Sequence, residues 1–401
     1  MEKKSPILYK KENECCGCTA CATICPKQAI KFVYNSEGFL YPSIDFDKCI
    51  GCLKCEEICA FKKDIATPIA KNQNTEIFAA RSKSEDVVIS SSSGGMFTVL
   101  SDFFLDRGNG VAACKYVYES DKVSLTLISD KTERNEARGS KYIQAELEDA
   151  FSEVIAFLRE YPEKKILVVG TGCQIAGLDL VLKSKKMRER AVLVDLICHG
   201  AASSNLWKQY IQKVEGEQEN EIDYITFKNK RYGWEKPSTF VKISGREIPI
   251  KPYSDWFYMG WSLRESCYQC PYTRIDRNSD LTIGDYWGIQ KVMPDFYDRM
   301  GVSLVITHTD AGRKLFESVK NNIDYRISNR KDCLQPRLTF PQSRPADRDI
   351  FWKDMLQKGM DYCIEKYVEQ YDISNKEKVK RFIKNHKVIF DYLFKSSYMP
   401  V

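Results

Sequence analysis

Regularly spaced cysteines are the first feature of this sequence that indicates chemistry. Nine of its sixteen cysteines lie between Cys15 and Cys59. They include two runs with the same spacing, C-x2-C-x2-C-x3-C, so the second run repeats the first. The runs are Cys15, Cys18, Cys21 and Cys25, followed by Pro26, and Cys49, Cys52, Cys55 and Cys59, followed by Ala60. Runs of this kind hold 4Fe-4S clusters, and in two-cluster ferredoxins the fourth cysteine of each run serves the other cluster.

The spacing therefore predicts two 4Fe-4S clusters in a small first domain. We assign the first cluster to Cys15, Cys18, Cys21 and Cys59, and the second to Cys49, Cys52, Cys55 and Cys25. Two zinc sites are the alternative, but they favour separate C-x-x-C pairs. Cys16 is left over, and we expect it to be a small neighbour without a ligand role. Between the runs, residues 29–44 predict two short strands around a turn at residues 35–38.

Four later cysteines form a second group. Cys267 and Cys270 make a C-x-x-C, while Cys173 and Cys198 each follow a predicted buried strand and precede a helix. The carboxyl ends of strands in open α/β sheets are where cofactors bind, and a helix start favours anions. One interpretation is a third four-thiolate site. The alternatives are that Cys173 and Cys198 are buried small residues, and that Cys267 and Cys270 form a redox dithiol or half of a zinc site.

The elements that must position these cysteines indicate an α/β (α+β) chain. Residues 76–82 and 87–90 predict strands, and residues 91–108 predict a small-residue loop that leads into an apolar helix closed by Gly108. Residues 164–182 and 191–211 both predict strand, turn and helix. Later segments predict further strands, some of them antiparallel. From about residue 341 the sequence becomes helical and polar.

Composition limits the class of protein. With 401 residues and 43% hydrophobic content, the chain can bury cores without disulfides. No apolar run is long enough for a transmembrane segment, and the first residues lack the apolar stretch of an export signal. We therefore expect a cytoplasmic protein, where cysteines serve metals or redox chemistry. A net charge of +6 is small for this length, so nucleic acid is not an expected partner.

A family resemblance then becomes specific. The ordered segments SSSGGMFTVL, RGSKYIQAE, GTGCQIAGL, DLICHG, FKNKRYGW, LRESCYQCPY, SDLTIGDYWG and GVSLVITHTDAG resemble the coenzyme F420 (deazaflavin) hydrogenase/dehydrogenase beta-subunit family. The chain looks most like the bacterial branch with a fused amino-terminal two-cluster ferredoxin. The resemblance implies bound FAD beside a third 4Fe-4S cluster, with Cys173, Cys198, Cys267 and Cys270 as ligands. Many relatives have proline where this chain has Gly172.

The resemblance also implies flavin contacts in two loops. Its flavin-binding segments match Ser93, Gly94, Gly95 and Thr98, and Gly139, Ser140, Lys141 and Tyr142. Physically, a glycine pair before a helix lets backbone amides approach a pyrophosphate, although such loops are also common turns. Lys141 offers a charge to phosphates or to a reduced flavin ring, although an ordinary exposed basic loop would look the same.

Candidates for proton transfer are few. His199 directly follows the predicted ligand Cys198, and Lys141 offers a charge to a reduced flavin ring. We predict that these two residues are the catalytic groups. The alternative for His199 is a buried structural histidine. Asp285 is a further candidate, and its alternative is an ordinary turn residue at a strand end. The resulting domain division is a two-cluster ferredoxin domain over residues 1–75, a mixed-sheet FAD and iron-sulfur core over residues 76–340, and a helical extension over residues 341–401.

Together these features predict an iron-sulfur flavoprotein oxidoreductase. Electrons would pass between a low-potential donor (ferredoxin or reduced deazaflavin coenzyme), three 4Fe-4S clusters and FAD, and then to or from a small organic substrate. By analogy with fused bacterial relatives, that substrate is a polysaccharide-biosynthesis intermediate. The alternative is a non-catalytic electron-transfer subunit that docks on a partner hydrogenase or dehydrogenase. Residues 376–395 predict a basic amphipathic helix, which either packs on the domain or lies on a membrane surface.

Overall fold

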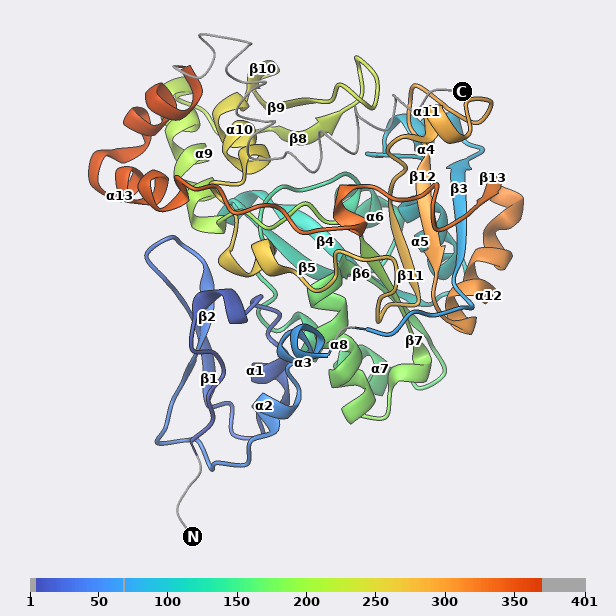
Figure 1. Cartoon of the computed structure of the whole chain (residues 1–401), viewed down its shortest axis with the longest axis horizontal. Helices are drawn as coiled ribbons and strands as arrows, with labels where there is room; N and C mark the ends of the chain where they lie inside the picture. Colours follow the sequence, from blue (N-terminus) through green and yellow to red (C-terminus); the bar gives the residue numbers. More distant parts are fainter. Residues whose placement is uncertain (1–4, 68, 370–401) are drawn as a thin grey trace.

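The computed structural model describes residues 5–67 and 69–369 and centres on an eight-stranded mixed sheet (Figure 1). The strand order is β13-β3-β12-β11-β7-β6-β4-β5. Strands β11, β7, β6 and β4 are parallel, and the outer pairings are antiparallel. The strands are β3 (Glu76–Ser82), β4 (Gly110–Val117), β5 (Lys122–Ile128), β6 (Ile166–Thr171), β7 (Ala191–Leu196), β11 (Leu281–Asp285), β12 (Ser303–Thr307) and β13 (Ile323–Ser328). The predicted α/β class with a mixed sheet is confirmed.

Helices cover both faces of this sheet because successive side chains of its strands alternate between faces. Leu167 and Val169 of β6 pack in a core with helices α5 (Met96–Leu105), α6 (Lys131–Ala137) and α12 (Asp310–Val319). Ile166 and Val168 pack in the opposite core with α7 (Ala150–Glu160) and α8 (Gly172–Ser184). A strand buried on both faces is a continuous apolar run in sequence, as predicted for residues 164–171.

The N-terminal region is built against this sheet layer (Figure 1). It contains α1 (Ala20–Ile24), β1 (Ile30–Tyr34), β2 (Leu40–Ile44), α2 (Lys54–Glu57) and α3 (Ala60–Ala66). Strands β1 and β2 form the predicted hairpin, in which Tyr34 lies opposite Leu40. Ala20, Ile24 and Ile58 join the core of α7 and α8. Because of this shared core, the cysteine runs have a fixed position relative to α8.

A second layer carries further strands and helices. Strands β8 (Tyr224–Asn229), β9 (Ser238–Ile243) and β10 (Arg246–Pro249) form a small antiparallel sheet. It shares a core with α9 (Ser204–Gln218), α10 (Lys251–Met259), α13 (Arg348–Ile364) and the β1–β2 hairpin. Helix α13 agrees with the helical end predicted from residue 341. The amphipathic segment predicted at residues 376–395 lies outside the described residues. In residues 5–67 and 69–369, no helix is long and apolar enough to cross a membrane.

One predicted strand is wrong. Residues 87–90 belong mostly to a short helix, α4 (Glu85–Ile89). The β-branched residues Val87 and Val88 favoured a strand, but Ser84 caps the helix by accepting a hydrogen bond from the Val87 amide. Glu85 and Asp86 then place negative charge in the first turn, where the helix dipole stabilises it. Capping therefore outweighs β propensity here.

His308, at the end of β12, makes the fold sensitive to acid. The imidazole is buried, and its Nε2 lies 2.8 Å from Thr282 Oγ1. Burial, followed by the charge of Arg277, lowers the pKa of His308 to about 3. An unfolded histidine binds a proton near pH 6.5. As the pH falls below that value, the unfolded state gains a proton that the folded state does not, so stability falls by about 1.4 kcal/mol per pH unit.

We expect His308→Gln to remove this contribution, because glutamine can bond Thr282 but does not titrate. The measurement is the free energy of unfolding of both proteins at intervals from pH 6.5 to pH 5. The wild type should lose about 1.4 kcal/mol per pH unit more than the variant. Equal slopes would contradict the assignment.

Candidate iron-sulfur and flavin site

The two cysteine runs fold into the same loop. Gly17 and Gly51 occupy equivalent positions and have φ angles of 74° and 69°. Thr19 and Leu53, two residues later, are also equivalent and have φ angles of 60° and 59°. Glycine adopts positive φ at little cost, which explains its place in both runs. The duplication in the sequence is therefore also a duplication of backbone conformation.

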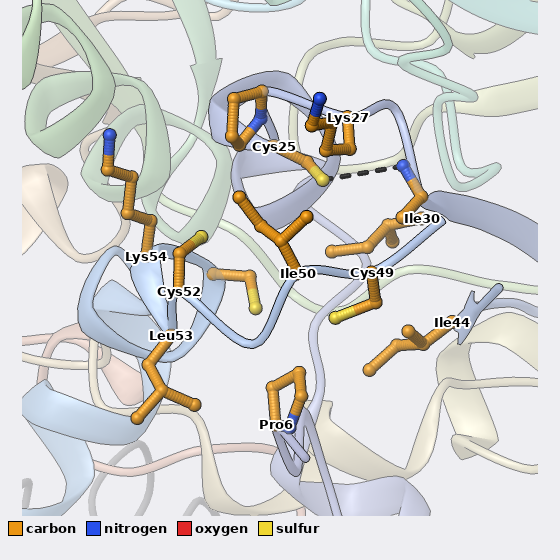
Figure 2. A pocket seen from close by; sticks show the side chains of 13 residues that line it. Pro6, Cys25, Lys27, Ile30, Ile44, Cys49, Ile50, Cys52, Leu53 and Lys54 are labelled. Carbon is orange, nitrogen blue, oxygen red and sulfur yellow. Dashed lines mark hydrogen bonds between the residues drawn. The ribbon is translucent and has the colours of Figure 1, made fainter. Parts of the chain in front are cut away.

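The second loop surrounds a hollow (Figure 2). All four cysteines predicted for the second cluster line it: Cys25, Cys49, Cys52 and Cys55. The Ala29 amide donates to Cys25 Sγ at 3.3 Å, and the Gly51 amide donates to Cys49 Sγ at 3.4 Å. Such amides favour a thiolate. Cys25 comes from the first run, so the structure places it with the second run, as the crossed assignment predicts. Cys52 is exposed, and this site therefore lies at the surface.

The first loop lies deeper. The pKa of Cys59 is raised to about 11, mainly by burial and in smaller part by the charges of Cys18 and Cys15. Burial also raises the pKa of Cys21, with Cys18, Cys15 and Cys59 as the charges around it. Cys59 of the second run thus lies with the first run, in agreement with the crossed assignment.

Helix α8 lies directly against this first loop. A Cβ on Gly177 would be 2.8 Å from Cys18 Sγ and 3.2 Å from Cys18 Cβ. Such contacts are too short, so only glycine lets the loop pack this closely. Cys173 is one helical turn before Gly177, on the same face of α8. The first cysteine site and the later cysteines are therefore neighbours.

The later cysteines come together from three segments. Cys173 lies in the first turn of α8, and Cys198 lies two residues beyond β7. Cys267 lies in the short helix η4 (Glu265–Gln269), and Cys270 follows it. Burial raises the pKa of Cys270, with Cys173, Cys267 and Cys198 as the neighbouring charges. Burial also raises the pKa of Cys198 to about 12, again with Cys267 and Cys173 beside it. The structure brings the four predicted ligands to one place.

A single zinc ion would need these thiols to converge on one point. Among the residues that the structure describes, no three His, Cys, Asp or Glu side chains converge closely enough to hold a single ion. With Zn–S bonds of about 2.3 Å, the thiolates of a tetrahedral zinc site would lie about 3.8 Å apart.

Cys16 lies between two groups of predicted ligands, a position that the sequence did not indicate. It is buried in a cluster with Cys18, Cys59, Cys173 and Cys270. A hydrogen bond from the Cys16 thiol is the main cause that lowers the pKa of Cys173 to about 7, and another lowers the pKa of Cys18. Cys16 therefore fills the space between the first and third cysteine sites, while its predicted lack of a ligand role stays a prediction.

The two predicted flavin loops are adjacent. The Ser140 amide donates to Ser92 Oγ at 2.8 Å, and the Ser140 and Ser92 hydroxyls are 3.1 Å apart. Two nearby polar atoms are buried with no hydrogen-bond partner in the described residues, Thr98 Oγ1 and Arg138 Nε. Buried polar atoms are nearly always bonded, so these two suit a polar ligand such as a phosphate group.

Local packing explains part of the glycine pattern in these loops. A Cβ on Gly94 would lie 2.6 Å from the Ala80 carbonyl oxygen, and one on Gly95 would lie 2.8 Å from Val87 Cγ1. Neighbouring atoms of Ala80 and Val87 therefore leave no room for a side chain at either position. Gly139 differs, because it has a φ of 81° and its Cβ would meet only Ser92 Oγ, at 3.9 Å. The space beside Gly139 is open to a ligand.

Lys141 is held by backbone. Its Nζ donates to the carbonyls of Ala137 at 2.7 Å, Arg138 at 2.9 Å, Cys114 at 3.1 Å and Glu136 at 3.3 Å. Burial lowers the pKa of this ammonium to about 8. The Lys141 ammonium therefore caps the carboxyl end of α6. Its predicted catalytic role stays a prediction and would require the ammonium to leave these carbonyls.

An aromatic stack joins the flavin loop to the third cysteine site. Tyr142 stacks on Phe257 with a centroid distance of 4.4 Å, and Phe257 lies 4.8 Å from the His199 ring. His199 Nδ1 is 3.4 Å from Arg337 Nη2. Because an arginine can only donate, Nδ1 accepts and the ring proton is on Nε2. His199 thus lies between its neighbour Cys198 and the stack that ends at Tyr142.

Sequence reasoning missed four residues of this region: Phe257, Tyr258, Arg264 and Arg337. Tyr258 donates to the Tyr142 hydroxyl at 3.0 Å. None of the four belongs to a spaced motif, although Arg264 lies three residues before Cys267. Asp285, a weaker candidate, forms an ion pair with Lys228 and keeps its Oδ1 buried without a partner in the described part of the chain.

Comparisons with known proteins give two matches to family models. Residues 163–332 match the family model described as the C terminus of the coenzyme F420 hydrogenase/dehydrogenase beta subunit. Residues 14–63 match the model of the 4Fe-4S dicluster domain. No curated protein matches the chain.

Among solved structures, the chain is similar to a chain of the xenon-derivatised F420-reducing NiFe hydrogenase complex from Methanosarcina barkeri. The identity is 16% and the TM-score 0.44, with 76% of this chain and 92% of that chain covered. The two family matches include every cysteine predicted as a ligand. Residues 163–332 of this chain are therefore similar to the C terminus of the coenzyme F420 hydrogenase/dehydrogenase beta subunit, and they follow a segment similar to a 4Fe-4S dicluster domain in the same polypeptide.

Proposed function

We propose that this protein is an iron-sulfur flavoprotein oxidoreductase that passes electrons between a low-potential donor and a small organic substrate. The observation that carries the proposal is the convergence of four distant cysteines at a site that His199 and Phe257 connect to Tyr142, which lies in one of the two adjoining loops. The donor is a ferredoxin or the reduced deazaflavin coenzyme, and the chain works in the cytoplasm. The proposed division is a ferredoxin domain over residues 1–75, a core over residues 76–340 and an extension over residues 341–401.

The proposed route begins at the surface. Cys52 is exposed, so the second cluster site is open to an outside carrier. The first site lies between this entrance and α8, where Gly177 permits contact with Cys18. Cys173 then leads to the third site. The step from the first site to the third joins groups that are packed in one cluster, which excludes water and limits side reactions.

The proposed flavin site lies at the far end of this route. Ser93, Gly94, Gly95, Thr98, Gly139 and Ser140 would hold FAD, with Tyr142 beside its ring. When bound, FAD exchanges both single electrons and pairs, as organic substrates require. His199 would hold a proton on Nε2 close to the stack of Phe257 and Tyr142. A nearby hydrogen-bond donor of this kind also tunes a cluster or flavin.

Cofactor content tests the proposal. After anaerobic purification we expect about twelve irons and one flavin per chain, with the absorbance of both. With an artificial low-potential donor, the purified chain should then reduce or oxidise a small molecule without another protein. A chain with this content that is inert until a hydrogenase or dehydrogenase is added would instead be an electron-transfer subunit. About eight irons and no flavin would overturn the proposed core.

A further inference from the structure

Arg264 is a buried cation at the first cysteine site. Only 1% of the Arg264 residue is exposed to solvent. The Nε donates to the Cys15 carbonyl at 2.8 Å, and Nη2 donates to the Leu40 carbonyl at 3.0 Å. Nη2 also lies 3.8 Å from Cys15 Sγ, and the guanidinium stacks 3.9 Å over the Tyr41 ring. The positive charge therefore touches a predicted cluster ligand directly.

The backbone of the same residue supports the third site. The Arg264 carbonyl accepts from the Cys267 amide at 2.9 Å, and the Arg264 amide donates to the Ala201 carbonyl at 2.9 Å. The Ala201 amide in turn donates to Cys267 Sγ at 3.3 Å. Arg264 thus starts the turn that carries Cys267 and Cys270 while its side chain reaches Cys15. It links the two sites mechanically and electrostatically.

Among the described residues, the charge of Arg264 has no carboxylate partner. Burying a charge is costly unless an opposite charge lies beside it. Nη1 bonds only the neutral amide oxygen of Gln144, at 3.2 Å. No carboxylate of the described residues forms an ion pair with Arg264 within 4.0 Å, in contrast to Arg134, Arg277 and Arg348. Within this part of the chain, the group beside Arg264 that can supply the counter-charge is the Cys15 thiolate, together with whatever the thiolates of this site bind.

Other buried arginines show that this is unusual. Arg134 pairs with Asp102 at 2.8 Å, Arg277 with Asp195 at 3.4 Å, and Arg348 with Glu37 at 2.5 Å. Within the same described ranges, only Arg337 resembles Arg264 among buried arginines, since it too has no carboxylate partner. Arg337 lies near Cys198, Cys267 and Cys270. Both arginines without carboxylates are therefore at predicted cluster sites.

We propose that Arg264 is the counter-charge of the cluster held by Cys15, Cys18, Cys21 and Cys59, and that it favours the reduced state of that cluster. This inference rests on the proposed function. Reduction adds one negative charge to a site whose net charge sets its potential, and a fixed cation at short range stabilises that charge. Electrons that enter at the exposed site of Cys52 then settle at the inner site, beside Cys173. Arg264 is a positioning residue that acts through the ligands.

The test is a redox titration of the full chain, purified anaerobically and followed by electron paramagnetic resonance. Arg264→Met should lower the equilibrium constant for reducing the inner cluster about tenfold, which is about 59 mV for a one-electron step. Arg264→Lys keeps the charge and should stay near wild type. The matched control is Arg188→Met, because Arg188 is another largely buried arginine, but it pairs with Asp179 and Asp280. It should not shift this potential.

Each outcome decides the question. An Arg264→Met potential equal to that of wild type, or equal shifts in Arg264→Met and Arg188→Met, would overturn the inference alone. If Arg264→Met instead loses the inner cluster, recovery in Arg264→Lys but not in Arg264→Gln supports the charge, whereas equal behaviour of the two overturns it. A wild-type chain without iron at this site would overturn the proposed function itself.

Discussion

Replacing Cys267 with serine is expected to remove about four of about twelve irons per chain, because one cube loses a ligand that no neighbour replaces. The loss should also reduce flavin content, since Cys198 of the third site is followed directly by His199, whose ring lies against the stack of Phe257 and Tyr142. The two clusters of the N-terminal region should remain, because their ligands come from residues 15–59. Iron and flavin analysis of anaerobically purified protein measures both effects.

The control for this variant is Cys333→Ser. Cys333 is a fully buried thiol in a separate apolar core, where its Sγ lies 3.6 Å from the Arg330 carbonyl oxygen. This variant also replaces a thiol with a hydroxyl, but at a residue without a predicted ligand role. All irons should therefore remain bound. Unchanged iron content in Cys267→Ser, or an equal loss in both variants, would remove Cys267 from the proposed ligand set.

Arg348→Met is expected to destabilise the protein by about 3–5 kcal/mol, the usual effect of breaking a buried ion pair from one side. Arg348 is buried on α13, and it bonds Glu37 at 2.8 Å and Glu265 at 2.7 Å. Glu37 lies in the turn of the β1–β2 hairpin. Without Arg348, the partly buried Glu37 would lose its cation, and Glu265 would keep only the more exposed Arg344. Anaerobic chemical denaturation measures the difference in unfolding free energy.

Arg344 provides a matched comparison for this ion pair. It contacts the same Glu265 at 2.9 Å, but its side chain is 36% exposed. Exposed pairs contribute little, so Arg344→Met should cost less than about 1 kcal/mol. If the two variants lose equal stability, the hairpin is not held to the core through Arg348. The expected contrast would show that the N-terminal region is fixed to the rest by a buried charge pair.

Local patterns account for the parts of this protein that could be predicted from sequence. The two cysteine runs, the β1–β2 hairpin and the unit of β6 with α8 each depend on residues close together in the chain. Their spacing therefore carries the information. The later cysteines could be grouped because Cys173 and Cys198 both follow parallel strands, whose ends meet at one edge of a sheet. The strand predicted at residues 87–90 failed because one capping serine outweighed two valines.

Only the folded chain shows the contacts between distant residues. The sequence by itself determined which cysteines form repeated loops, because three ligands within seven residues have few ways to be arranged. It did not determine that Cys16 fills the gap between two sites, that Gly177 is small to admit Cys18, or that Arg264 reaches back to Cys15. A single residue has no spacing pattern, and its partner is more than a hundred residues away. Such contacts exist only after α8 and η4 have packed against the N-terminal loops.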